Sequence, residues 1–265
     1  MPALVNQVAH FLDDWTRMNT DFSFHSIGIV HSCFTEKFGI PRQPGLVPAA
    51  RATLELLPPY DRDEIYRGLD EFSHLWIVFV FHAIDANQRR PTVRPPRLGG
   101  NRRLGVFATR SGFRPNPIGI SSVVLESVRR EHGKMVLELS GVDLLDQTPV
   151  LDIKPYLPYA DSIPDASGGY AAQPPRPSLS IQFSGRGRQA SAEAEKAYPG
   201  FTELVIQVLR ADPRPAYMAD RCNRTEFGLQ LYDRNIRWSV CAGTIVVETI
   251  ETVAAGSKTK RKGPL

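Results

Sequence analysis

Short apolar segments separated by turn residues dominate residues 22–158. Apolar and polar side chains alternate in Ala52–Leu57, which predicts a strand with one buried face. Residues Ser73–His82 are almost uniformly apolar and rich in β-branched and aromatic side chains, which predicts a strand buried on both faces. Such segments recur about every ten residues, the spacing of an all-β sandwich or barrel. Further strands are predicted at Phe24–Ser32, Gly105–Thr109, Ile118–Ser127, Lys134–Leu139 and Pro149–Ile153.

The pattern changes in the second part of the chain. Residues 159–188 are rich in Pro, Ser, Gly and Ala, which predicts a linker or loose surface loop with one strand at Leu179–Phe183. Residues 189–253 predict a smaller α+β domain with two helices, Ala190–Ala197 and Phe201–Ala211. Three strands should complete this domain: Phe227–Tyr232, Ile236–Cys241 and Thr244–Glu251.

Both ends of the chain differ from this body. Residues 1–21 form an N-terminal extension whose apolar side chains have helical spacing, and no function is assigned to it. Residues 254–265 are a basic tail that we expect to be disordered. Strands do not alternate with long helices, and no GxGxxG opens a helix after a strand, so a Rossmann sheet is not expected.

Composition adds one local feature. The net charge of +4 is small, but Ala86–Leu125 contains no Asp or Glu. Guanidinium groups bind phosphate or carboxylate with two parallel hydrogen bonds, so a segment rich in Arg and free of acid predicts an anion-binding surface, such as one for nucleic acid. The arginines of this segment are Arg89, Arg90, Arg94, Arg97, Arg102, Arg103, Arg110 and Arg114.

Several classes of chemistry are not supported. The three cysteines lie far apart, which argues against a disulfide framework or a zinc site and favours a reducing cytoplasm. The six histidines have no metal-ligand spacing, so no metal is expected, and the GxSxG and GxxxxGK[ST] motifs are missing. No run of eighteen apolar residues and no secretory signal occur, so no membrane association is expected. A nucleic-acid enzyme with an organic cofactor and a nucleic-acid-binding module without chemistry remain.

Four smaller clusters contain candidate chemistry. They are the stiff Pro41–Gly45 loop (PRQPG), His82 at a strand end, the acidic turn Asp143–Asp146, and DPRPAY at 212–217. Each also has an ordinary explanation. Aspartates often stabilise turns, a strand-end His is usually a hydrogen-bonded polar residue, and Asp-Pro ends a helix. Taken singly, none specifies a function.

Together, these segments resemble the TrmO family. The resemblance lies in PRQPG at 41–45, GLDEFSHLWIVFVFH at 68–82, RPTVRPPRLGGNRRLGVFATRSGFRPNPIG at 90–119, DIKPYLPYADSIPDA at 152–166 and DPRPAY at 212–217. TrmO enzymes are S-adenosylmethionine-dependent tRNA methyltransferases that act on N6-threonylcarbamoyladenosine at position 37, beside the anticodon. The resemblance implies a small, non-Rossmann β-barrel at 22–158, a smaller C-terminal domain and a homodimer.

The resemblance also implies roles for residues. Asp212, Arg214 and Tyr217 of the DPRPAY segment are implied to be tied to activity, and Tyr217 or Asp212 is our candidate proton acceptor. Arg94, Arg97, Arg102, Arg103 and Arg114 are expected to bind the anticodon loop, because the family acts on RNA. The cofactor S-adenosyl-L-methionine is implied to lie against Pro41, Arg42, Gln43, His82, Ala83, Arg110, Ile120, Asp143, Leu144, Leu145 and Asp146.

Two other functions are also compatible with the sequence. A catalytically inactive adaptor of the same fold would bind RNA without needing the cofactor. A methyltransferase for a small metabolite would leave the concentration of arginines in Ala86–Leu125 unexplained.

Overall fold

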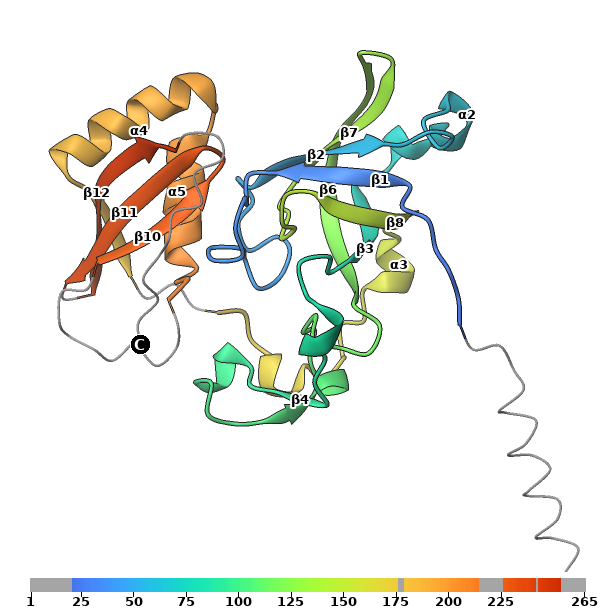
Figure 1. Cartoon of the computed structure of the whole chain (residues 1–265), viewed down its shortest axis with the longest axis horizontal. Coiled ribbons are helices and arrows are strands. Elements are labelled where there is room, and N and C mark those ends of the chain that lie inside the picture. The colour runs from blue at the N-terminus through green and yellow to red at the C-terminus, as the bar shows by residue number, and fades with distance from the viewer. Residues whose placement is uncertain (1–20, 176–178, 215–225, 242, 254–265) are drawn as a thin grey trace, which may run out of the picture.

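The computed structural model describes residues 21–175, 179–214, 226–241 and 243–253 (Figure 1). The helix predicted within residues 1–20, the basic tail 254–265 and the candidate Tyr217 lie outside these ranges.

Six antiparallel strands make up the larger part of the fold. They are β1 (Gly28–Ser32), β2 (Arg51–Leu56), β3 (His74–Val80), β6 (Ile118–Glu131), β7 (Lys134–Ser140) and β8 (Thr148–Pro155). The strands close into a barrel in the order β1-β2-β7-β6-β3-β8, since β1 pairs with β2 on one side and with β8 on the other (Figure 1). The prediction of a mainly β fold with a small barrel is confirmed.

Strand β3 corrects the prediction of a strand buried on both faces. Leu75, Ile77 and Phe79 are buried, whereas Trp76 and Val78 between them are only half-buried. Successive side chains of a strand point to opposite faces, and only one face of a barrel strand turns inward. The outer face of β3 is therefore apolar without belonging to the interior.

A long excursion, residues 81–117, connects β3 to β6. Its two short strands, β4 (Thr92–Val93) and β5 (Leu104–Gly105), pair only with each other. The strand predicted at Gly105–Thr109 is wrong. Val106 donates its N–H to the Pro91 carbonyl, and the Thr109 N–H bonds back to the Val106 carbonyl at 3.1 Å, so the chain turns there instead of extending.

The C-terminal part is a four-stranded sheet with two helices. The sheet has the order β10-β11-β12-β9, in which β9 runs parallel to β12. Because β9 and the first turn of α4 belong to this part, it extends into residues 159–188, which were predicted as a linker. The elements of this part are β9 (Ser180–Phe183), α4 (Gly185–Ala197), α5 (Phe201–Arg210), β10 (Glu226–Leu231), β11 (Arg234–Cys241) and β12 (Thr244–Thr252). Two short helices, α2 (Asp63–Tyr66) and α3 (Pro158–Asp161), come earlier in the chain.

The C-terminal part packs against the loop that joins β1 to β2, residues 33–50 (Figure 1). Tyr232 donates its N–H to the Cys33 carbonyl at 2.8 Å, and the Gln207 side chain accepts from the Ala49 N–H at 2.9 Å. These contacts position the end of α5 beside the same loop that carries Pro41–Gly45.

Candidate active site

Three loops leave the same end of the barrel because antiparallel strands alternate in direction. They follow β1, β3 and β7 and comprise residues 33–50, 81–117 and 141–147. Between them lies a cavity of about 720 Å³. Cavities of this size are typical of sites for small molecules and cofactors.

Most of the predicted cofactor residues lie on the wall of this cavity. Leu144 does not, because it is buried in the core at 1% exposure. Asp146 is also absent from the wall, and its carboxylate accepts from the Ser32 N–H at 3.0 Å. The wall includes Pro41, Arg42, Gln43, His82, Ala83, Arg110, Ile120, Asp143 and Leu145.

The apolar wall depends on a glycine in β6. A Cβ atom at Gly119 would lie 2.3 Å from the tip of the Phe79 ring. Gly119 therefore leaves room for the Phe79 ring against β6, and Phe79 and Gly119 line the cavity together with Ile118 and Ile120. Apolar walls with a few polar groups are typical of ligand sites.

Asp143 supplies negative charge to the wall. Ser121, which is fully buried, donates its hydroxyl to the Asp143 carboxylate at 2.5 Å. Burial raises the pKa of Asp143 to about 6, and the Ser121 hydrogen bond and the positive charge of Arg110 offset this rise only in part. At neutral pH the carboxylate is ionised and can bind a cation.

Arg110 is held from the opposite loop. Its guanidinium donates to the Gln43 side-chain oxygen at 2.6 Å, and the Gln43 amide donates to the Arg42 carbonyl. This chain of hydrogen bonds joins the Pro41–Gly45 loop to the excursion. It leaves a guanidinium near the ionised Asp143, where it can bind a carboxylate.

Lys37 is a cavity residue that the sequence did not single out. Its ammonium donates to the Ala83 carbonyl. Partial burial of the ring and the nearby charge of Lys37 lower the pKa of His82, which favours the neutral imidazole at pH 7. No motif surrounds Lys37, and only the folding of the 33–50 loop brings it to the cavity.

Asp212 and Arg214 form a bidentate pair just beyond α5. The Arg214 Nε and Nη2 atoms lie 2.7 and 2.8 Å from the two oxygens of Asp212. Arg214 is only 6% exposed, and Asp212 has a left-handed backbone (φ 46°) that ends the helix. Burial lowers the pKa of Arg42, while the charge of Asp212 raises it and that of Arg97 lowers it. The C-terminal segment and the excursion thus both approach the cavity at Arg42.

The arginines predicted to bind RNA separate into two groups. Arg114 lines the cavity and donates to the Thr109 carbonyl at 3.2 Å. The other four are exposed on the excursion: Arg94, Arg97, Arg102 and Arg103.

Comparisons with known proteins agree with this architecture. The family model of the tRNA-methyltransferase O (TrmO) N-terminal domain matches residues 29–162, and that of the TrmO C-terminal domain matches residues 176–253. This chain belongs to the TrmO family. It is therefore a member of a family of tRNA methyltransferases, and the two matched regions correspond to the barrel and the C-terminal sheet.

Relatives match nearly the full length of the chain. A tRNA (adenine(37)-N6)-methyltransferase from Escherichia coli (strain K12) is 47% identical, covering 88% of this chain and 99% of its own. A putative S-adenosylmethionine-dependent methyltransferase, RcsF, from Pseudomonas aeruginosa is 52% identical over 82% of this chain and 91% of its own. A crystal structure of TrmO from Pseudomonas aeruginosa has a TM-score of 0.73 and 41% identity, covering 88% of this chain and all of the other.

The cavity fits S-adenosylmethionine chemically. The cofactor has a cationic sulfonium, an ammonium, a carboxylate and an adenine. Asp143 is suited to the cationic groups, Arg110 to the carboxylate, and the apolar wall around Ile120 to the adenine. Among the described residues, no group of three or more His, Cys, Asp or Glu is placed to hold a metal ion. Within the same ranges, no helix is long and apolar enough to span a membrane.

Proposed function

We propose that this TrmO chain transfers a methyl group from S-adenosylmethionine to N6 of N6-threonylcarbamoyladenosine at position 37 of tRNA. The observation that carries this proposal is the cavity itself. It gathers residues from the loops after β1, β3 and β7 around one partly buried carboxylate and several guanidinium groups. The Escherichia coli relative, a tRNA (adenine(37)-N6)-methyltransferase, supports the same position in tRNA.

The cavity residues bind and orient in this proposal. When bound, S-adenosylmethionine supplies an electrophilic methyl group. Asp143 holds the cationic end, and Arg110, fixed by Gln43, holds the carboxylate. Orientation is the main demand of such a transfer, because the attacking nitrogen must align with the methyl carbon at contact distance.

The acceptor nitrogen belongs to a urea-like group and must lose its proton. Asp212 and Tyr217 are the candidate proton acceptors. The bidentate bond to Arg214 occupies both oxygens of Asp212. We therefore assign proton removal to Tyr217, with Asp212 and Arg214 as positioning residues for the segment that carries it.

Positive charge around the cavity suits tRNA. Lys37, Arg42, Arg110 and Arg114 line the wall, while Asp143 is the one carboxylate among the described residues that do so. S-adenosylmethionine is itself a net cation, so the surplus positive charge favours another anion. We assign it to the phosphates of the anticodon loop and to the threonyl carboxylate, together with the exposed arginines of the excursion.

We further infer a homodimer working in the cytoplasm, where tRNA is modified. The resemblance to TrmO implies the dimer. The exposed apolar side chains of Ile118 and Ile120, 39% and 52% exposed at the cavity, support a surface that a second subunit covers.

The test is a reconstituted reaction with purified protein and two matched tRNAs, one with threonylcarbamoyladenosine at position 37 and one with adenosine. We expect methylation of the first only, at N6. Binding of S-adenosylmethionine, measured by calorimetry, separates the enzyme from an inactive RNA-binding adaptor. A chain that binds tRNA but neither binds the cofactor nor methylates would overturn the proposal.

A further inference from the structure

Phe107 is a large apolar side chain that the fold leaves exposed at the cavity. It is 77% exposed and yet lines the wall, whereas Phe79 on the same wall is 6% exposed. Single exposed apolar residues are common on protein surfaces, so exposure alone assigns nothing. Whether the exposed Phe107 ring has a function depends on how rigidly the ring is held and on which side chains surround it.

The backbone under Phe107 is fixed on both sides. Val106 is buried at 3% exposure and donates its N–H to the Pro91 carbonyl at 3.0 Å. Thr109 returns its hydroxyl to the Val106 carbonyl at 2.8 Å, which closes the turn of Val106–Ala108. The ring thus projects from a rigid turn rather than from a loose loop, although little of it is buried.

A guanidinium lies near one face of the ring. The Arg114 carbon Cζ is 5.9 Å from the centre of the Phe107 ring, within the range of a cation–π contact. Arg114 is held in turn by the Thr109 carbonyl at 3.2 Å. An aromatic ring beside a guanidinium is a common surface for stacking an unpaired nucleobase.

The charges around the ring distinguish a nucleotide from a purely apolar partner. Lys37, Arg42 and Arg110 line the same cavity as Phe107 and Arg114. A base attached to a phosphate backbone can stack on the ring while its phosphates bind these cations. An apolar protein surface would leave the cations without an anionic partner. Enzymes that modify a base must also take it out of its stack, and a protein aromatic ring can replace the lost stacking.

We propose that Phe107 is a positioning residue on which the adenine ring of the target nucleoside stacks, so that its N6 substituent points into the cavity. This proposal rests on the proposed function. It assigns to Phe107 the recognition of the base plane and leaves the cofactor contacts to Asp143 and Arg110.

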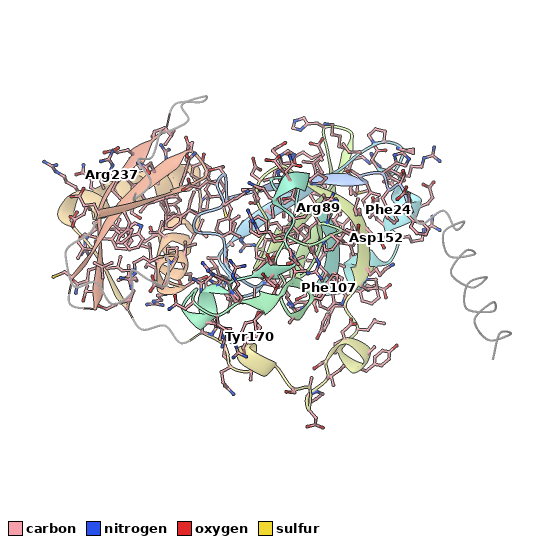
Figure 2. All side chains as sticks on the ribbon, turned by 60° about the horizontal axis from the view of Figure 1, so that its bottom comes forward. Phe24, Arg89, Phe107, Asp152, Tyr170 and Arg237 are labelled. Carbon is pink, nitrogen blue, oxygen red and sulfur yellow. The ribbon has the colours of Figure 1, made fainter. Side chains whose placement is uncertain are left out.

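The experiment compares variants of the full chain. Steady-state methylation of tRNA is measured for Phe107→Ala, Phe107→Leu and Phe107→Tyr, with calorimetry for S-adenosylmethionine and the melting temperature of each variant. Phe24→Ala is the matched control, because Phe24 is 67% exposed and does not line the cavity (Figure 2).

We expect Phe107→Ala to reduce kcat/KM for tRNA about 10- to 100-fold, the scale of losing one stacked base. Phe107→Leu should behave like the Ala variant, since it keeps apolar area but has no aromatic face, while Phe107→Tyr should restore the rate. Cofactor affinity and melting temperature should stay at wild-type values in all three, and Phe24→Ala should match wild type throughout.

Two results would overturn the proposal. Full activity of Phe107→Ala would mean that no base stacks there, and full activity of Phe107→Leu would mean that the ring makes only an apolar contact, for example with a second subunit. Both require an active wild-type chain, so they differ from failure of the proposed function, in which the wild-type chain itself does not methylate tRNA.

Discussion

At the scale of single residues, the ionised carboxylate of Asp143 favours binding of a cationic ligand but lowers the stability of the fold. Its carboxylate supplies negative charge for a cationic ligand, but burial raises its pKa to about 6 from an ordinary value of 3.8. Ionising it in the folded chain therefore costs stability at neutral pH, by up to about 3 kcal/mol. That cost disappears as the pH falls through 6 toward 4, because the folded chain then keeps the group protonated.

Asp143→Asn should separate these two effects. We expect cofactor affinity to fall at least about tenfold, since the ionised partner of the cationic groups is lost. In the absence of cofactor, the free energy of unfolding at pH 7.5 should rise by on the order of 1 kcal/mol, and this gain should vanish by about pH 4. Calorimetry and denaturant titrations across pH measure both.

Asp146→Asn is the control from the same turn. Its carboxylate accepts from the Ser32 N–H, a bond that the amide oxygen of Asn can also accept, and it does not line the cavity, so this variant should keep its cofactor affinity. A loss of cofactor affinity in Asp146→Asn equal to that in Asp143→Asn would contradict the geometry of the site.

The proton acceptor gives a second prediction at this scale. Tyr217→Phe should abolish methyl transfer in a single turnover while tRNA and cofactor still bind, because only the proton-accepting oxygen is removed. Asp212→Asn should weaken the bidentate pair with Arg214 and lower the rate less severely. Normal single-turnover rates in both variants would refute the assignment to this segment.

At the scale of elements, β6 forms both a barrel strand and a cavity wall. Gly119→Ala should destabilise the fold by about 1–3 kcal/mol, because the new Cβ would overlap the buried Phe79 ring. Gly105→Ala is the matched control: no heavy atom lies within 4 Å of a Cβ built there. Melting temperatures measure the difference, and equal values for the two variants would show that the strand yields to the clash.

The excursion gives a prediction about salt. Arg97→Ala and Arg103→Ala should each weaken tRNA binding and reduce the slope of log K against log salt by about 0.7–0.9, the value for one lost phosphate contact. Arg67→Ala, an exposed arginine outside the excursion, is the control. Binding by Arg97→Ala and Arg103→Ala that equals wild type across the salt series would remove these residues from the tRNA surface.

The pattern of apolar and polar residues predicted individual strands better than it predicted how these strands close into a barrel. Strands such as Arg51–Leu56 were found because alternation marks one buried face. Ser73–His82 was wrongly expected to be buried on both faces, since an apolar run does not reveal that its sheet closes into a barrel. Gly105–Thr109 was wrongly expected to be a strand, because the Thr109 N–H bonds back to the Val106 carbonyl and closes a turn, while the Val106 N–H bonds to the Pro91 carbonyl.

The candidate site was predicted from the resemblance of whole segments to a known family, and not from the spacing of single catalytic or ligand-binding residues. Resemblance to TrmO suggested the cofactor residues, nine of which line the cavity. Lys37 was missed because nothing in its neighbours indicates a site. Arg114 was predicted to bind RNA together with Arg94 and Arg97, and that prediction stays open; the sequence did not show that Arg114 lines the cavity, where it donates to the Thr109 carbonyl.

At the scale of the whole molecule, the C-terminal sheet brings the Asp212 segment to a cavity built by the barrel. Hydrogen bonds from Tyr232 to Cys33 and from Ala49 to Gln207 fix this arrangement. In our proposal the barrel residues hold the cofactor, and the C-terminal segment supplies the proton acceptor. The proposal therefore predicts that both parts of the chain are needed for one reaction.

The central claim is methylation of threonylcarbamoyladenosine in tRNA by this cavity, and mass spectrometry of tRNA nucleosides tests it most directly. Cells that lack the gene are complemented with the wild-type chain or with Asp143→Asn. The N6-methylated nucleoside should be present with the wild-type chain, reduced with Asp143→Asn and absent with no gene. Its persistence without the gene, or its absence with the wild-type chain, would contradict the account.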